Sequence, residues 1–227
     1  PAGLARQNQL NITASIQNPY GVSDLISGMV AISFPTPLIR TGLAIQRVSL
    51  IDIYSENILY ISAAGIVKFK TIPIRFGGSI KYESAKVENY ENIKNPYNFD
   101  LDFGLLIDLS DNLFFGYSVK NLLEPEFEFI SQKDKVLKIE SIGLCYNWRK
   151  SVNFLIDHHN YYNNSTWNLG SEIWFYDVFA ARLGMLDEKL TVGFGLKTKK
   201  WTIDTAVLSH QELGSTYRIS IGVSFSE

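Results

Sequence analysis

The sequence predicts an all-β protein, a transmembrane up-and-down antiparallel β-barrel of about fourteen strands that forms a single domain over residues 1–227. Three observations predict this fold. Apolar residues recur at every second position, short and long connections alternate along the chain, and only 19% of the residues are charged. An ordinary soluble domain has roughly a quarter of its residues charged.

Strict alternation between apolar and polar residues is typical of strands with one apolar face. It is clearest in residues 99–109 and 216–225, where the apolar set carries no charge and the opposite set mixes charges with glycine, serine and threonine. The fourteen strands are expected to centre near Ile12, Val30, Leu43, Ala63, Gly77, Phe103, Tyr117, Gly143, Phe154, Leu169, Ala181, Phe194, Ile203 and Ile219.

The connections distinguish the two ends of such a barrel. Tight turns are expected at Ser110-Asp111, Arg149-Lys150 and Lys199-Lys200, and the two longest connections are expected at residues 85–98 and 122–134. Outer-membrane barrels have short periplasmic turns and longer outer loops, so the short turns should face the periplasm. The alternative is a soluble antiparallel sandwich or barrel, whose apolar face would be the core.

Aromatic residues gather near both ends of the expected strands, as in the girdles that flank the apolar band of membrane barrels. The outer girdle is expected to contain Tyr20, Tyr54, Tyr82, Tyr161 and Tyr217. The periplasmic girdle is expected to contain Phe34, Phe69, Trp148, Trp201 and Phe225.

Several function classes are disfavoured. The net charge of −2 offers no basic field for nucleic acid, and the single cysteine, Cys145, allows neither an internal disulfide nor a thiolate zinc site. His158 and His159 are adjacent and point to opposite faces, and Ser209 and His210 are neighbours that cannot converge on a substrate. We therefore expect no metal, no cofactor and no catalytic residues.

Motifs at both ends of the chain resemble a known family. Pro1-Ala2-Gly3-Leu4-Ala5 resembles an "NPAGLA" box, and residues 213–221 are similar to an "LGxTxRISL" ending, both typical of the PorV/PorQ family of bacterial outer-membrane barrels, which are FadL-like. Three further matches lie between them, at residues 116–122, at 169–174 with 182–184, and at 192–195 with 203–204. In relatives a signal peptide and an N-terminal plug segment precede the opening box, so we expect both to be absent from this sequence.

The resemblance implies a non-enzymatic barrel in a bacterial outer membrane, surrounded by the lipid bilayer. Its leading implication is a subunit in protein secretion or surface attachment of the type IX kind, bound to a larger protein. The alternatives are a FadL-like channel for small hydrophobic molecules and a structural anchor barrel for a surface layer.

Two sets of residues are candidate sites. Pairing across tight turns should bring Glu172 to Arg182 and Asp102 to Lys120 inside the lumen. The lumen charges are expected to comprise Asp102, Lys120, Glu172, Arg182, Asp204 and Arg218. The long outer loops carry Tyr90, Tyr97, Phe127 and Phe129, which are expected to form a lid or a protein contact. Recurrent mid-strand glycines indicate either close approach to an internal plug or barrel curvature.

Overall fold

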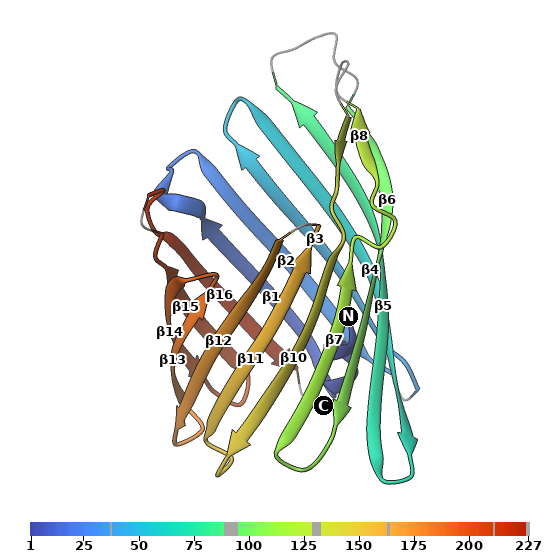
Figure 1. Ribbon diagram of the computed structural model, residues 1–227, viewed down its shortest axis with the longest axis vertical. Coiled ribbons are helices and arrows are strands. Elements are labelled where there is room, and N and C mark those ends of the chain that lie inside the picture. Colours follow the sequence, from blue (N-terminus) through green and yellow to red (C-terminus); the bar gives the residue numbers. More distant parts are fainter. Residues whose placement is uncertain (37, 89–94, 129–132, 163, 211, 226–227) are drawn as a thin grey trace.

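The computed structural model describes residues 1–36, 38–88, 95–128, 133–162, 164–210 and 212–225. It confirms a closed antiparallel barrel of fourteen strands, in which each strand pairs with its sequence neighbours (Figure 1). Two short strands, β8 and β9, form a separate hairpin, so β7 pairs directly with β10. Pairing of β1 with β16 closes the barrel, from Leu10 opposite Phe225 to Asn18 opposite Tyr217.

The strands of the barrel wall have the following bounds: β1 Leu10–Asn18, β2 Leu25–Pro35, β3 Arg40–Leu50, β4 Tyr54–Phe69, β5 Ile72–Val87, β6 Tyr97–Asp108, β7 Leu113–Lys120, β10 Ile139–Trp148, β11 Val152–Tyr161, β12 Asn164–Phe175, β13 Phe179–Leu186, β14 Lys189–Lys197, β15 Trp201–Leu208 and β16 Thr216–Phe225. The hairpin strands are β8 Glu126–Glu128 and β9 Lys133–Lys135, and two short 3-10 helices span η1 Ala2–Arg6 and η2 Pro19–Gly21. Among the described residues, no helix is long and apolar enough to cross a bilayer.

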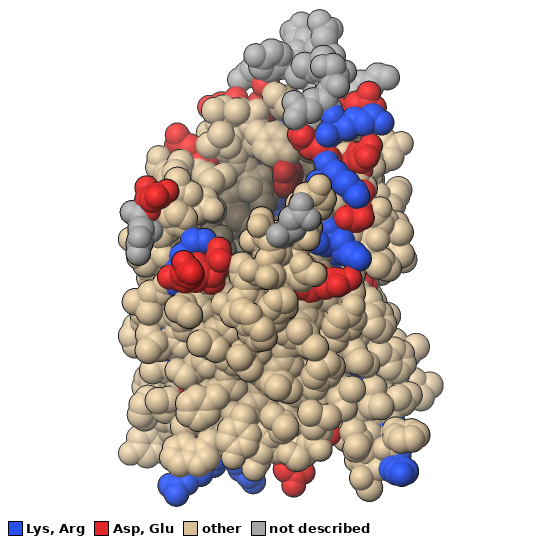
Figure 2. Space-filling view, in the orientation of Figure 1, with Lys and Arg blue, Asp and Glu red and all other residues tan. Residues whose placement is uncertain are grey.

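The apolar face of each strand points outward, as predicted. Ile45 is 53% exposed and Phe194 is 62% exposed, although both lie in mid-strand, where Ile45 pairs with Val30 and Phe194 with Ala181. A soluble barrel would bury these side chains, and a band of exposed apolar residues around a closed wall is suited to lipid. Figure 2 accordingly shows a broad middle zone almost free of charged atoms, with charges confined to the two ends.

The barrel is taller on one side than on the other. β4 and β5 have sixteen residues each and rise with β6 at the top of Figure 1, whereas the wall from β12 to β16 is shorter. Three-residue connections join β10 to β11 and β12 to β13, and each has two residues with left-handed backbone, Arg149 and Lys150 in the first and Tyr176 and Asp177 in the second. These turns lie at the lower end, which is the expected periplasmic side.

Three boundaries differ from the prediction because pairing continues into segments expected to be loops. β5 runs to Val87 and β6 begins at Tyr97, so the connection predicted at 85–98 is shorter. Likewise, His158 and His159 lie within β11, paired with Trp167 and Thr166 of β12. The connection 122–134, in turn, contains the β8 segment and most of β9 rather than a plain loop.

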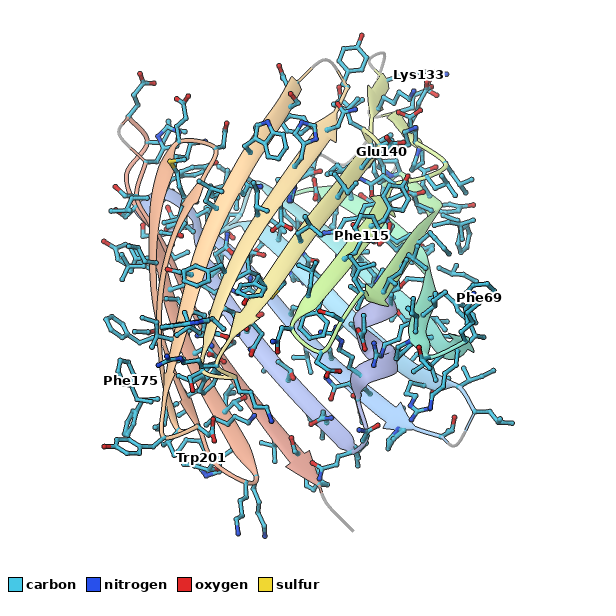
Figure 3. All side chains as sticks on the ribbon, turned by 60° about the horizontal axis from the view of Figure 1, so that its bottom comes forward. Phe69, Phe115, Lys133, Glu140, Phe175 and Trp201 are labelled. Carbon is cyan, nitrogen blue, oxygen red and sulfur yellow. The ribbon has the colours of Figure 1, made fainter. Side chains whose placement is uncertain are left out.

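The aromatic residues at the lower end point outward. The five residues expected there, Phe34, Phe69, Trp148, Trp201 and Phe225, are all exposed apolar side chains. Figure 3 shows Phe69, Trp201 and the additional Phe175 directed away from the wall. At the upper end Tyr82 and Tyr217 are exposed on the outer face, whereas Tyr54 faces the lumen and donates a hydrogen bond to Glu56.

Candidate functional site

The helix η1 occupies part of the lumen, with the first residue between the two ends of the barrel (Figure 1). It packs on β3 to β6, where glycines make room for it. A Cβ atom at Gly77 would lie 2.8 Å from the carbonyl carbon of Pro1, and one at Gly104 would lie 3.0 Å from the nitrogen of Ala2. These glycines allow the helix backbone to lie directly against the wall, and Ala2 is only 3% exposed.

Charged residues fix the lower end of η1. Arg6 lies 3.2 Å from Asp108 of β6, and Asp108 also accepts a 2.6 Å hydrogen bond from Arg75 of β5. On the other side, Arg40 donates to the backbone carbonyl oxygen of Gln7 over 3.3 Å. The helix is therefore held by the wall on two sides and divides the interior.

Above η1 lies a cavity of about 730 Å³, which we call the upper cavity. One side of its lining is largely apolar or aromatic and comes from β2, β3, β4 and the segment after β9: Met29, Ala44, Ile58, Tyr60 and Val136. The opposite side carries charges from β5 and β6. A cavity of this size with a mixed lining is typical of small-molecule sites.

The charged side of the upper cavity is centred on Lys81. Its Nζ atom lies 3.1 Å from Glu83, 3.3 Å from Asp100 and 3.1 Å from Asp102, and it donates to the side-chain oxygen of Asn121. Lys81 is 3% exposed and Asp100 is completely buried. Backbone N–H groups of Leu101 and Leu123 donate to Asp100, and that of Asn121 donates to Asp102. Such pairing and hydrogen bonding are what a buried charge needs.

Further cavities continue downward past η1. A cavity of about 310 Å³ shares Pro1, Ala44 and Ser62 with the upper cavity. It in turn shares Gln7, Asn11 and Thr13 with a cavity of about 530 Å³ that reaches the turn at 197–199. The three spaces form a series from the upper end to the lower end of the barrel, and we call this series the lumen path.

A side branch of about 440 Å³ also adjoins the upper cavity, with which it shares Pro1 and Lys120. Cys145, Asp157 and His159 line it. The side chain of Asp157 fills the space that a Cβ atom at Gly143 would occupy. Among the described residues, no group of three or more His, Cys, Asp or Glu side chains is placed to hold a metal ion.

A second charged network lies on the wall opposite η1. Arg182 donates 2.7 Å hydrogen bonds to Glu172 and to Asp204, so it links β12, β13 and β15. Glu172 also accepts hydrogen bonds from Trp174 and Asn153. Gly195 lies beneath Arg182, because a Cβ atom there would come within 2.9 Å of the guanidinium group.

Among the remaining lumen charges, the ion-pair partner of Asp102 differs from the expectation. Asp102 forms its ion pair with Lys81 rather than with Lys120, because β5 brings Lys81 to the other side of Asp102. Lys120 is exposed to the cavities that it lines. Asp204 pairs with Arg182, and Arg218 stands opposite Gln17 and Ala206.

Of the four expected loop contacts, two can be placed. Phe127 of β8 lines the upper cavity. Tyr97 belongs to β6, is 63% exposed on the outer wall and stacks at 6.0 Å on Tyr82, so it contributes to the upper aromatic girdle rather than to a loop contact. Tyr90 and Phe129 lie outside the described residues.

The β8–β9 hairpin stands beside the mouth of the upper cavity. Asn98 donates to the backbone carbonyl oxygen of Glu126, and Lys135 lies 3.0 Å from Glu124. Lys133 lies 3.5 Å from Glu126, and Lys138 lies 3.0 Å from Glu140. Figure 2 shows a column of alternating acidic and basic groups beside a hollow in the upper end.

The histidine beside Ser209 has a structural role. The Nδ1 atom of His210 accepts hydrogen bonds from the backbone N–H groups of Glu212 and Leu213, and its ring packs edge-on against Tyr20 at 5.9 Å. These contacts hold the connection between β15 and β16.

No known protein family model matches the chain, and no curated protein matches it in sequence. Solved structures do match its fold. A TodX monoaromatic hydrocarbon channel, the deltaS2 mutant, is 9% identical, with a TM-score of 0.68 and coverage of 99% of this chain and 92% of that one. The CymD monoaromatic hydrocarbon channel is 10% identical, with a TM-score of 0.66 and coverage of 100% and 91%.

A Pseudomonas aeruginosa FadL homologue is also similar, at 10% identity, a TM-score of 0.57 and coverage of 99% and 92%. The chain therefore has the fold of FadL-like bacterial outer-membrane barrels, and its apolar outer wall lies in the lipid bilayer of that membrane. Solved neighbours also include a protein named as a toluene transporter, TbuX of Ralstonia pickettii, and one named as a porin, KdgM.

Proposed function

We propose that this barrel is a FadL-like channel that admits small, largely apolar molecules through its lumen. The observation that carries the proposal is the lumen path, three adjoining cavities that lead from the upper mouth past η1 to the lower turns. A purely structural barrel of this size has no need to keep such a series of adjoining spaces. The structural neighbours include monoaromatic hydrocarbon channels, which supports the same class of solute.

The upper cavity suits a molecule with an apolar body and at most one polar group. Met29, Ala44 and Ile58 offer apolar contact on one side. On the opposite side, the charges around Lys81 are already paired with one another. A bound solute would therefore gain mainly from apolar burial, and its one polar group can meet Lys120, the exposed cation of the lining.

The test uses two alanines that differ in the face on which they lie. Ala44 lines both the upper cavity and the next one, whereas Ala63 lies on the outer face of β4. Cells whose permeability is limited by the outer membrane are supplied with labelled toluene. Expression of the chain should raise uptake, Ala44→Trp should abolish the increase, and Ala63→Trp should keep it. Uptake that is unchanged by expression of the folded chain would contradict the proposal.

A second candidate is a subunit in protein secretion or surface attachment, as the PorV/PorQ resemblance implies. The feature that favours it is the β8–β9 hairpin, whose charged residues stand exposed at the upper end and offer a surface for a larger protein. Recovery of one specific protein with the intact chain, and its loss when residues 124–137 are replaced by a short Gly-Ser turn, would support this candidate. Toluene uptake that persists in the same variant would separate the two functions.

A further inference from the structure

The outer wall carries a groove that the channel proposal does not use. It has a volume of about 630 Å³ and extends from β15 across β16, β1, β2 and β3 to β4 on the lipid-facing side. Its apolar lining includes Ala14, Gly28, Val30, Ile45, Ile219 and Ile221. Ala14 and Gly28 lie next to bulky neighbours, Val30 and Ile16, so the small side chains leave a depression between large ones.

One end of the groove holds an exposed arginine. Arg47 of β3 stands opposite Gly28 on one side and Asn57 on the other, and all three line the groove. Within the described part of the chain, Arg47 forms no hydrogen bond or ion pair. An unpaired guanidinium on the lipid face of a barrel is destabilising, most strongly at mid-membrane and less near the interface.

The position of Arg47 coincides with the upper edge of the apolar band. On β3 the outward residues change from Leu43 and Ile45 to Arg47 and Ser49 toward the upper end. The outward face of β4 also changes from apolar to polar at this height, because the outward residue above Leu59 is Asn57. A charge at this height meets lipid headgroups, while the apolar groove below it lies at the depth of acyl chains.

We infer that the groove is a binding site for a phosphorylated membrane lipid. An acyl chain lies along Ala14, Gly28 and Val30, and Arg47 donates to the phosphate, with Asn57 beside it. Guanidinium groups bind phosphate through paired N–H donors. The phosphate is the negatively charged partner that Arg47 lacks in the protein. The acyl chain covers the apolar surface that the small side chains leave open.

The experiment measures lipid binding to the purified full chain by native mass spectrometry, with phosphatidylglycerol as the probe. Dioleoylglycerol has the same chains without the phosphate, and oleate is a free fatty acid with one negative charge. Wild-type protein should bind phosphatidylglycerol well above dioleoylglycerol. Arg47→Gln should weaken binding of phosphatidylglycerol about tenfold or more, because a hydrogen bond to a charged group is removed.

A second variant tests the groove separately from the charge. A Cβ atom at Gly28 would contact only the carbonyl oxygen of Ser15, at 3.8 Å, so Gly28→Leu fills the groove without a backbone clash. It should also weaken binding of phosphatidylglycerol. The matched controls are Ala63→Leu, which adds bulk elsewhere on the outer face, and Lys86→Gln, which removes a charge elsewhere near the upper rim.

Both controls should bind as the wild type does, and heat-modifiable migration in gels verifies that every variant is a folded barrel. If both Arg47→Gln and Gly28→Leu bind phosphatidylglycerol as tightly as the wild type, the bound lipid belongs to a nonspecific annulus around the barrel. This result would overturn the inference. Oleate that binds at least as tightly as phosphatidylglycerol, with the same dependence on Arg47, would assign the groove to free fatty acid and overturn it as well.

Discussion

Replacing Arg182 with methionine removes the centre of the network on the wall opposite η1. The substitution keeps an unbranched apolar stem and deletes the two 2.7 Å hydrogen bonds to Glu172 and Asp204. Both carboxylates would then remain without their cation inside the lumen. Glu172 would keep its hydrogen bonds from Trp174 and Asn153, so Asp204 is the group left with fewer partners.

The size of the effect follows from burial. Breaking a fully buried pair costs about 3–5 kcal/mol. Here the side chains of Arg182, Glu172 and Asp204 are 32%, 21% and 39% exposed, so water replaces part of what is lost. We therefore expect Arg182→Met to lower the free energy of unfolding by about 2 kcal/mol, between the fully buried and the fully exposed cases.

The assay is urea unfolding of the barrel in phospholipid vesicles, followed by tryptophan fluorescence. The control is Lys189→Met, which removes an ion pair with Asp187 beside a turn and should cost no more than about 0.5 kcal/mol. A double-mutant cycle of Arg182→Met with Asp204→Asn should give a coupling energy of about 1 kcal/mol. Equal losses in Arg182→Met and Lys189→Met, or no coupling to Asp204, would refute this reasoning.

Two further predictions concern η1 and the β8–β9 hairpin. Gly77→Val should displace η1, because even the Cβ atom would lie 2.8 Å from the carbonyl carbon of Pro1. Displacement of η1 should raise the single-channel conductance of the barrel in planar bilayers. Unchanged conductance of an intact barrel would contradict the packing of η1 against Gly77. The hydrogen bond from Lys135, and then that from the backbone N–H of Lys138, lower the pKa of Glu124. This bond therefore stabilises the hairpin fully above the ordinary pKa of a glutamate, about 4.3, and loses its effect as the pH falls through the lowered value. Amide hydrogen exchange in the hairpin, corrected for the intrinsic effect of pH on exchange, should lose protection as the pH falls through that range, and Glu124→Gln should remove the dependence.

The fold was predictable because strand alternation is a local property. The fourteen expected strand centres lie in fourteen different strands of the barrel. Tight turns also fix register, which is why Glu172 was correctly placed opposite Arg182 across Tyr176 and Asp177. β8 and β9 were missed because each has only three residues, too few for alternation to be recognised.

The cluster around Lys81 was not predicted, for a physical reason. A hairpin turn specifies only one of the two neighbours of a strand. The turn between β6 and β7 indicated the neighbour of Asp102 on one side, whereas Lys81 comes from β5 across the longer connection between Val87 and Tyr97. A signal was present, because Lys81 and Glu83 on one strand and Asp100 and Asp102 on the next share the spacing of one strand face.

The sequence pattern did not show whether the mid-strand glycines accommodate an internal segment or only allow barrel curvature. Gly77 and Gly104 accommodate η1, as the plug interpretation expected. Gly143 and Gly195 instead make room for inward side chains, Asp157 in one case and Arg182 in the other. Close approach to the opening segment therefore explains Gly42, Gly77 and Gly104, and side-chain packing across strands explains Gly143 and Gly195 on the opposite wall.

The terminal motifs have structural roles that any barrel of this design would need. The opening box forms η1 against Gly77 and Gly104, and the closing motif supports the junction where the barrel closes. Gly214 has a φ of +90°, and a Cβ atom there would lie 2.7 Å from the carbonyl oxygen of Tyr20, whose N–H donates to the buried Thr216. Because both motifs serve barrel construction, they are compatible with a channel as much as with a secretion subunit. The difference in function must come from the lumen lining and the upper hairpin, which is why substitutions at Ala44 and replacement of residues 124–137 separate the two.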